Sequence, residues 1–115
     1  MIVVYGIPNC DTVKKARAWL AERGVAYRFH DFKKQGLPPK LLDHWLLHLG
    51  CDKLLNRQGT SWRKLDEAMR VGVVDAASAR AAMLAAPSSI KRPVIRWAKG
   101  DVLTVGFAAG FKPPL

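Results

Sequence analysis

The chain has 115 residues, a mass of 12.8 kDa and 50% apolar residues, enough for one domain, 1–115, whose core needs no disulfide or metal. No run approaches the roughly 18 apolar residues of a membrane span, and the first residues lack the basic flank of a signal peptide. We therefore expect a cytoplasmic protein with no membrane partner. The formal charge of +10 is spread along the whole sequence, which favours a solvated surface over a nucleic-acid-binding stripe.

The first third predicts a strand, a helix and a second strand. Ile2–Tyr5 is a short apolar run rich in β-branched residues, typical of a buried strand. Thr12–Arg23 has apolar positions at helical spacing, with Gly24 as the stop. Val25–Phe32 alternates apolar and polar residues, so a βαβ unit with parallel strands is expected. Three residues can serve as the N-cap of the helix: Asn9, Asp11 and Thr12.

The middle of the chain, about 38–86, is predicted to be a helical insertion. Its first helix has one apolar stripe, formed by Leu41, Leu42, Trp45, Leu46 and Leu49, and ends at Gly50. Ser61 is the expected cap of a short helix that turns Leu65 and Met69 inward. Asp75 is the expected cap of a last helix, Ala76–Ala85.

The final third predicts an antiparallel hairpin. Its strands are Pro93–Trp97 and Val102–Val105, with the turn at Lys99-Gly100-Asp101. The order βαβ, helical insertion, ββ is an α/β arrangement of the thioredoxin-like kind. In such sheets the functional site lies at the carboxyl ends of the parallel strands. We therefore expect it at the loop Gly6–Asp11, which follows the first strand.

Cys10 lies in that loop and is the candidate nucleophile. Unpaired N–H groups at a helix N-terminus stabilise a thiolate and lower its pKa, and Lys14 adds a nearby positive charge. Position 13 is Val13, so the second cysteine of a CxxC pair is missing. A lone reactive thiol must pass its adduct to another thiol, either Cys51 or an external one such as glutathione.

The segment around Pro93 is the second part of the sequence that indicates a functional site. An X-Pro bond admits the cis form, in which the preceding residue can turn toward a ligand. That residue is Arg92, whose planar guanidinium suits an oxyanion or a carboxylate, and Arg57 offers the same chemistry.

A metal site is not expected. His44, His48 and Cys51 have helix-compatible spacing, but Lys40 and the two histidines form one polar row opposite the leucine stripe. Cys51 lacks an activating neighbourhood and is predicted to be a structural residue.

The sequence resembles the ArsC/Spx/YffB family of thioredoxin-fold proteins over essentially the whole chain, most closely its YffB-like branch. Three segments in this order carry the resemblance: Tyr5–Thr12, Leu54–Arg57 and Ile90–Val94. Trp62–Asp66 and Val105–Phe107 support it.

In arsenate reductases of this family the loop cysteine attacks arsenic, glutathione completes the adduct and three arginines hold the oxyanion. Cys10 matches the nucleophile, and Arg57 and Arg92 match two of the arginines. The third position is filled near Val105. The resemblance implies a thiol oxidoreductase with no bound cofactor and with glutathione as co-substrate. Four residues are expected to support the site: Asn9, Thr12, Lys14 and Pro93.

Three functions stay open. A glutathione-dependent reductase acting on a small-molecule or protein disulfide, with glutaredoxin as a further partner, is favoured over an arsenate reductase because an arginine is missing. An Spx-like redox regulator that binds RNA polymerase is the alternative from another class, and Val13 argues against it. Salt-dependent binding to nucleic acid is weaker still.

Overall fold

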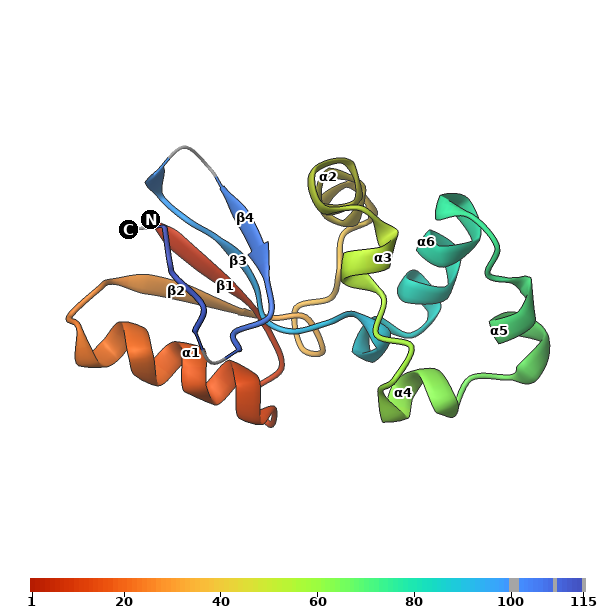
Figure 1. The fold of residues 1–115 in the computed structure, drawn as a ribbon, viewed down its shortest axis with the longest axis horizontal. Coiled ribbons are helices and arrows are strands. Elements are labelled where there is room, and N and C mark those ends of the chain that lie inside the picture. Colours follow the sequence, from red (N-terminus) through yellow and green to blue (C-terminus); the bar gives the residue numbers. More distant parts are fainter. Residues whose placement is uncertain (100–101, 109, 115) are drawn as a thin grey trace. The chain divides into compact units, whose positions relative to one another are not determined.

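The computed structural model describes residues 1–99, 102–108 and 110–114, and the chain divides into two compact units (Figure 1). Met1–Gly36 and Arg92–Leu115 form the sheet unit, and Leu37–Lys91 forms the helical unit. The sheet unit contains β1 (Ile2–Gly6), α1 (Asp11–Glu22), β2 (Tyr27–Asp31), β3 (Val94–Arg96) and β4 (Leu103–Val105). The helical unit contains α2 (Pro39–Leu49), α3 (Cys51–Leu54), α4 (Thr60–Arg63), α5 (Glu67–Gly72), α6 (Ala76–Ala85) and the 3-10 helix η1 (Pro87–Ser89).

The four strands form one sheet in the order β2-β1-β3-β4. β1 runs parallel to β2 and antiparallel to β3, which in turn pairs antiparallel with β4. The predicted βαβ…ββ core with a helical insertion is therefore confirmed. The predicted turn at Lys99-Gly100-Asp101 falls partly on residues 100 and 101, which lie outside the described residues.

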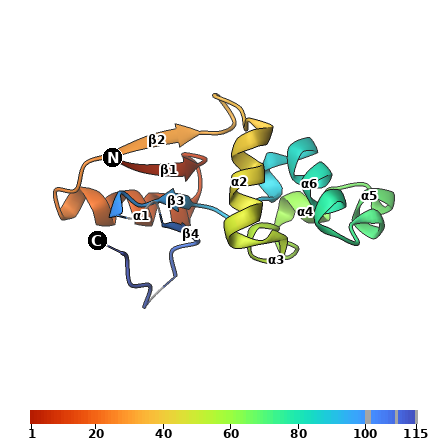
Figure 2. The same ribbon diagram turned by 90° about the horizontal axis from the view of Figure 1, so that it is seen from above.

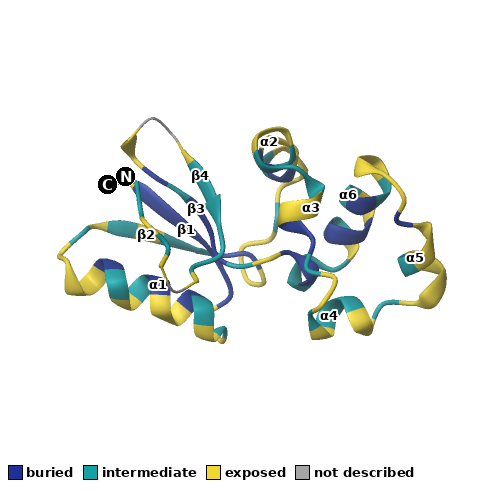
Figure 3. Ribbon diagram, in the orientation of Figure 1, coloured by how far each residue is buried: buried dark blue, intermediate teal, exposed yellow. Residues whose placement is uncertain are grey.

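The core of the sheet unit lies between the sheet and α1, which runs along one sheet face (Figure 2). Its fully or nearly buried members are Ile2, Val4, Ala16, Leu20, Ile95 and Trp97. β1 is buried along its whole length (Figure 3), as a central strand should be. Each large apolar side chain buried here contributes about 1.5–3 kcal/mol, so the core fixes where α1 begins relative to the end of β1.

The start of α1 differs from the prediction. The carbonyl of Cys10 accepts the first helical hydrogen bond, from the N–H of Lys14 at 2.9 Å, so Cys10 itself is the N-cap. The predicted caps were wrong because the helix begins one residue earlier than its apolar periodicity indicates. Asn9 then precedes the cap, and Asp11 and Thr12 lie within the first turn.

The helical unit follows the prediction at both of its longer helices. α2 ends at Gly50, whose φ of 84° is a conformation that favours glycine. Asp75 caps α6 in a capping box with Ser78. None of the helices in the described part of the chain combines the length and apolar character that crossing a membrane requires.

The segment between α3 and α6 corrects the sequence reading. Two short helices replace the single expected one, and Gly59, not Ser61, is the N-cap of the first. The side chain of Asp66 accepts the N–H of Ala68 at 2.9 Å and starts a second helix. This break changes the helical phase, so Met69 is 38% exposed and does not face inward.

Candidate active site

Cys10 follows directly from the end of β1. The strand ends at Gly6, a short loop follows, and the extended backbone of Cys10 (φ −140°, ψ 122°) leads into α1. Its side chain is partly exposed, and the thiol is free. A partly exposed thiol at the start of a helix can be reached by a small molecule and also lies near unpaired N–H groups.

The electrostatics at this position favour the thiolate. Burial by itself raises the pKa of Cys10, but the backbone N–H of Val13, the guanidinium of Arg92 and the N–H of Thr12 together lower that pKa below its ordinary value. The sulfur does not adopt ordinary cap hydrogen-bond geometry. The N–H groups of Val13 and Thr12 nevertheless stabilise the thiolate and lower the pKa of Cys10, as expected where the first N–H groups of a helix converge.

Sheet topology explains why Arg92 meets Cys10. β3 is antiparallel to β1, with Val94 opposite Tyr5, so the beginning of β3 lies at the same sheet edge as the end of β1. The Arg92–Pro93 peptide bond is cis, as predicted. Arg92 is half-buried and donates a hydrogen bond to the Cys10 sulfur. We call Cys10, the N–H groups of Thr12 and Val13, and Arg92 the thiolate site.

The other residues predicted to support this site have varied surroundings. Thr12 contributes its backbone N–H, and Pro93 is buried beside Arg92. Asn9 and Lys14 are exposed. The charged group that lowers the pKa of Cys10 is Arg92, a role that the sequence had suggested for Lys14.

Val105 is the residue near which the resemblance to arsenate reductases predicts a third arginine. It is the last residue of β4 and pairs with Val94 of β3, and the N–H of the next residue, Gly106, donates to the carbonyl of Pro93 at 2.9 Å. This end of β4 therefore lies beside Pro93, the residue that follows Arg92 of the thiolate site. A valine there has no hydrogen-bond donor for an anion.

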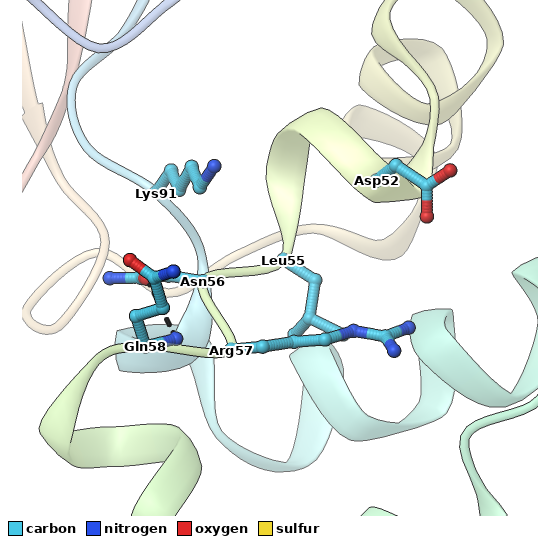
Figure 4. A pocket seen from close by; sticks show the side chains of 6 residues that line it. All are labelled: Asp52, Leu55, Asn56, Arg57, Gln58 and Lys91. Carbon is cyan, nitrogen blue, oxygen red and sulfur yellow. Dashed lines mark hydrogen bonds between the residues drawn. The ribbon is translucent and has the colours of Figure 1, made fainter.

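Arg57 belongs to the helical unit, where it lines a pocket of about 320 Å³ (Figure 4). The pocket is lined by Asp52, Leu55, Asn56, Arg57, Gln58 and Lys91. Pairing within the unit brings Lys91 to this segment, because the Lys91 N–H donates to the carbonyl of Leu54 at 2.7 Å. The lining contains two cationic side chains, two amides and one carboxylate, so it is polar with a positive excess.

The alternative metal ligands are separate from the thiolate site in sequence and character. His44 and His48 are exposed on α2, and their ring centroids are 4.5 Å apart. Cys51 is the first residue of the short helix α3 and is partly exposed. Among the described residues, no group of three or more histidine, cysteine or acidic side chains is arranged to hold a metal ion.

Sequence reasoning missed two contributions to the site. The sequence marks Val13 only as the residue in place of a second cysteine, whereas its N–H helps to stabilise the thiolate. The sequence predicts Arg92 to be a substrate ligand, whereas in the structure it also contacts the nucleophile. The first was detectable in the sequence, since the residues two and three positions after an N-cap carry unpaired N–H groups.

A single cysteine at the junction of β1 and α1, facing a cis-proline segment across the sheet edge, defines a thioredoxin-like α/β protein with a one-thiol site. The family model described as "ArsC family" matches residues 5–110. The chain belongs to the ArsC family.

Relatives and solved structures agree with this membership. A protein of Haemophilus influenzae is 42% identical over 95 residues, which is 83% of this chain and 82% of that protein. The structure of a protein named YffB is 49% identical with a TM-score of 0.85 and covers 94% of this chain and 92% of its own. An arsenate reductase (ArsC) related protein from Brucella melitensis is 53% identical with a TM-score of 0.74, covering 94% and 88%. The resemblance seen in the sequence, including its YffB-like character, is confirmed.

Proposed function

We propose that this protein is a glutathione-dependent thiol oxidoreductase whose nucleophile is Cys10. The lowered pKa of a partly exposed Cys10 carries the proposal, because a thiolate, and not a thiol, attacks sulfur or arsenic. Membership of the ArsC family and likeness to an arsenate reductase related protein support an oxidoreductase-like enzyme. A cytoplasmic location stays a prediction and agrees with a supply of reduced glutathione.

With a glutathionylated thiol as substrate, the reaction has two balanced steps. The Cys10 sulfur attacks the glutathione sulfur, a Cys10–glutathione disulfide forms, the substrate disulfide breaks and the substrate thiolate leaves. A second glutathione, deprotonated, attacks the glutathione sulfur of that adduct, releases oxidised glutathione and restores the Cys10 thiolate. The proton lost by this glutathione goes to the substrate thiolate. The substrate disulfide is reduced by two electrons and two glutathione moieties end as one disulfide.

The cationic side chains supply binding. Arg92 stabilises the thiolate before attack and again when Cys10 leaves the adduct. Arg57 and Lys91, which line the polar pocket of the helical unit, suit the carboxylates of glutathione, since carboxylates and guanidinium groups form charge-assisted hydrogen bonds. Glutathione as the resolving thiol does not require Cys51, whose role as a resolving thiol stays an alternative.

Arsenate reduction is the second candidate. The likeness to an arsenate reductase related protein favours it, and Arg57 and Arg92 provide two of the guanidinium groups found in such enzymes. Val105 removes the third, and one lost charge-assisted hydrogen bond costs about 1.5–3 kcal/mol. That corresponds to roughly one to two orders of magnitude in oxyanion affinity, so we favour a disulfide substrate.

An Spx-like regulator is the candidate from another class. Its redox switch would need a partner thiol for Cys10, and Val13 stands where the CxxC pattern places one. Co-purification with RNA polymerase in the absence of turnover would favour this class.

A coupled assay tests the proposal. Purified protein is given glutathione, glutathione reductase and NADPH with either a glutathionylated model thiol or arsenate, and NADPH oxidation is followed. We expect turnover of the disulfide to be lost in Cys10→Ser and kept in the matched variant Cys51→Ser. Disulfide turnover that survives Cys10→Ser refutes the proposed nucleophile, and faster turnover of arsenate than of the disulfide promotes the second candidate.

A further inference from the structure

Gly6 ends β1 in close contact with the first turn of α1. A methyl group at position 6 would lie 2.8 Å from Cγ2 and 3.4 Å from Cγ1 of Val13. Carbon atoms in proteins pack at about 3.5–4.0 Å, so an alanine at position 6 requires something to move. The contact involves the same residue whose N–H faces the Cys10 sulfur.

Neither side of this contact can yield easily. Gly6 is the end of a central strand: it pairs with Asp31 of β2, and its carbonyl accepts the N–H of Phe32 at 3.1 Å. Val13 is fully buried, and its β-branched side chain has few alternative rotamers. The first turn of α1 is therefore the part that would shift away from the strand.

We propose that Gly6 is a positioning residue for Cys10: its missing side chain lets the start of α1 seat against the end of β1, which places the N–H groups of Thr12 and Val13 around the Cys10 sulfur. The inference rests on the proposed function only in taking Cys10 as the reactive thiol. It adds a residue that fixes the geometry through the side chain of Val13.

The test measures the rate of Cys10 alkylation with iodoacetamide as a function of pH in a reference protein with the native residue at positions 6, 13 and 72 and in three variants of it. All of these proteins carry Cys51→Ser, so that the measured alkylation is that of Cys10. In Gly6→Ala we expect the pKa of Cys10 to rise by about 0.5 to 1, with a threefold to tenfold slower alkylation at neutral pH. Val13→Ala removes the two contacting methyl groups, so the double variant Gly6→Ala/Val13→Ala should return the pKa toward the native value.

Gly72→Ala is the matched control, because a methyl group added at position 72 meets nothing within 4 Å beyond its chain neighbours and the backbone of its own helix. It should leave the pKa of Cys10 unchanged. Circular dichroism reports whether each variant is folded. A folded Gly6→Ala with the native pKa overturns this inference and leaves the proposed function intact, whereas a native chain whose Cys10 titrates as an ordinary thiol overturns both. If Gly6→Ala does not fold, a folded double variant with near-native pKa supports the steric coupling, and an unfolded or raised-pKa double variant overturns it.

Discussion

Arg92 donates a hydrogen bond to the sulfur of Cys10, although the two residues are far apart in the sequence. The antiparallel pairing of β1 and β3 brings the two together, since it sets the residue before the cis-proline beside the residue that starts α1. One arginine can therefore stabilise the nucleophile and also lie where an anionic substrate arrives.

Replacing Arg92 should raise the pKa of Cys10. In Arg92→Gln the thiolate loses the guanidinium hydrogen bond and a positive charge. We expect the alkylation rate of Cys10 at neutral pH to fall about threefold to tenfold. This is a small effect for the loss of a charged partner, because Cys10 is partly exposed and solvent screens the charge. Arg92→Lys should recover part of the rate, since it keeps the charge without the planar fork. The exposed Arg28 in β2 offers a control, Arg28→Gln, which should behave as the native chain. Equal alkylation profiles for all variants would remove Arg92 from the thiolate site.

Protein stability should depend on pH through Cys10. The folded pKa of Cys10 is lower than that of the unfolded chain, so the unfolded chain binds more protons between the two values and stability rises with pH there. This contribution is complete above the ordinary thiol pKa of about 8.5 and is lost as the pH falls through the folded pKa. Urea denaturation under reducing conditions should show the stability of the native chain gaining on that of Cys10→Ser over this window. Parallel curves for the two proteins would contradict a thiolate stabilised by folding.

The polar pocket of the helical unit should affect substrate binding and leave the nucleophile unchanged. In Lys91→Gln and Arg57→Gln we expect the KM for glutathione to rise roughly threefold to tenfold, as for one lost charge-assisted pair of about 0.7–1.4 kcal/mol near the surface. Cys10 alkylation should keep its native pH profile. Lys53→Gln, an exposed lysine in α3 outside the pocket lining, is the control. An unchanged KM in both pocket variants would show that this pocket does not receive the co-substrate.

Val105→Arg should shift the balance between substrates. A guanidinium at the end of β4 lies beside the Pro93 segment, and we expect the KM for arsenate to fall about tenfold, as a gain of about 1.4 kcal/mol implies. Disulfide turnover should not improve. Val102→Arg places the same charge at an exposed position before β4 and should have no such effect. If arsenate turnover is already efficient in the native chain and unaffected by Val105→Arg, two arginines suffice and the favoured substrate class is wrong.

Local patterns predicted much of the sheet unit. The apolar run of β1, the helical spacing after Cys10 and the alternation around Tyr27 each depend on neighbours in sequence, and each element formed within one or two residues of its expected bounds. Predictions failed where one hydrogen bond changes a helix start: Cys10 replaced the expected caps of α1, and Asp66 opened a separate helix that left Met69 exposed.

The sequence by itself determined that a lone cysteine follows the first strand and starts a helix, and that an arginine precedes a proline suited to the cis form, because both features belong to short contiguous segments. Only the tertiary structure decided that Arg92 reaches Cys10, that Val105 lies beside the same proline, and that Gly6 leaves space for Val13. Those relationships depend on strand pairing and close packing between distant segments, and local periodicity carries no information about which strand edge faces which helix end.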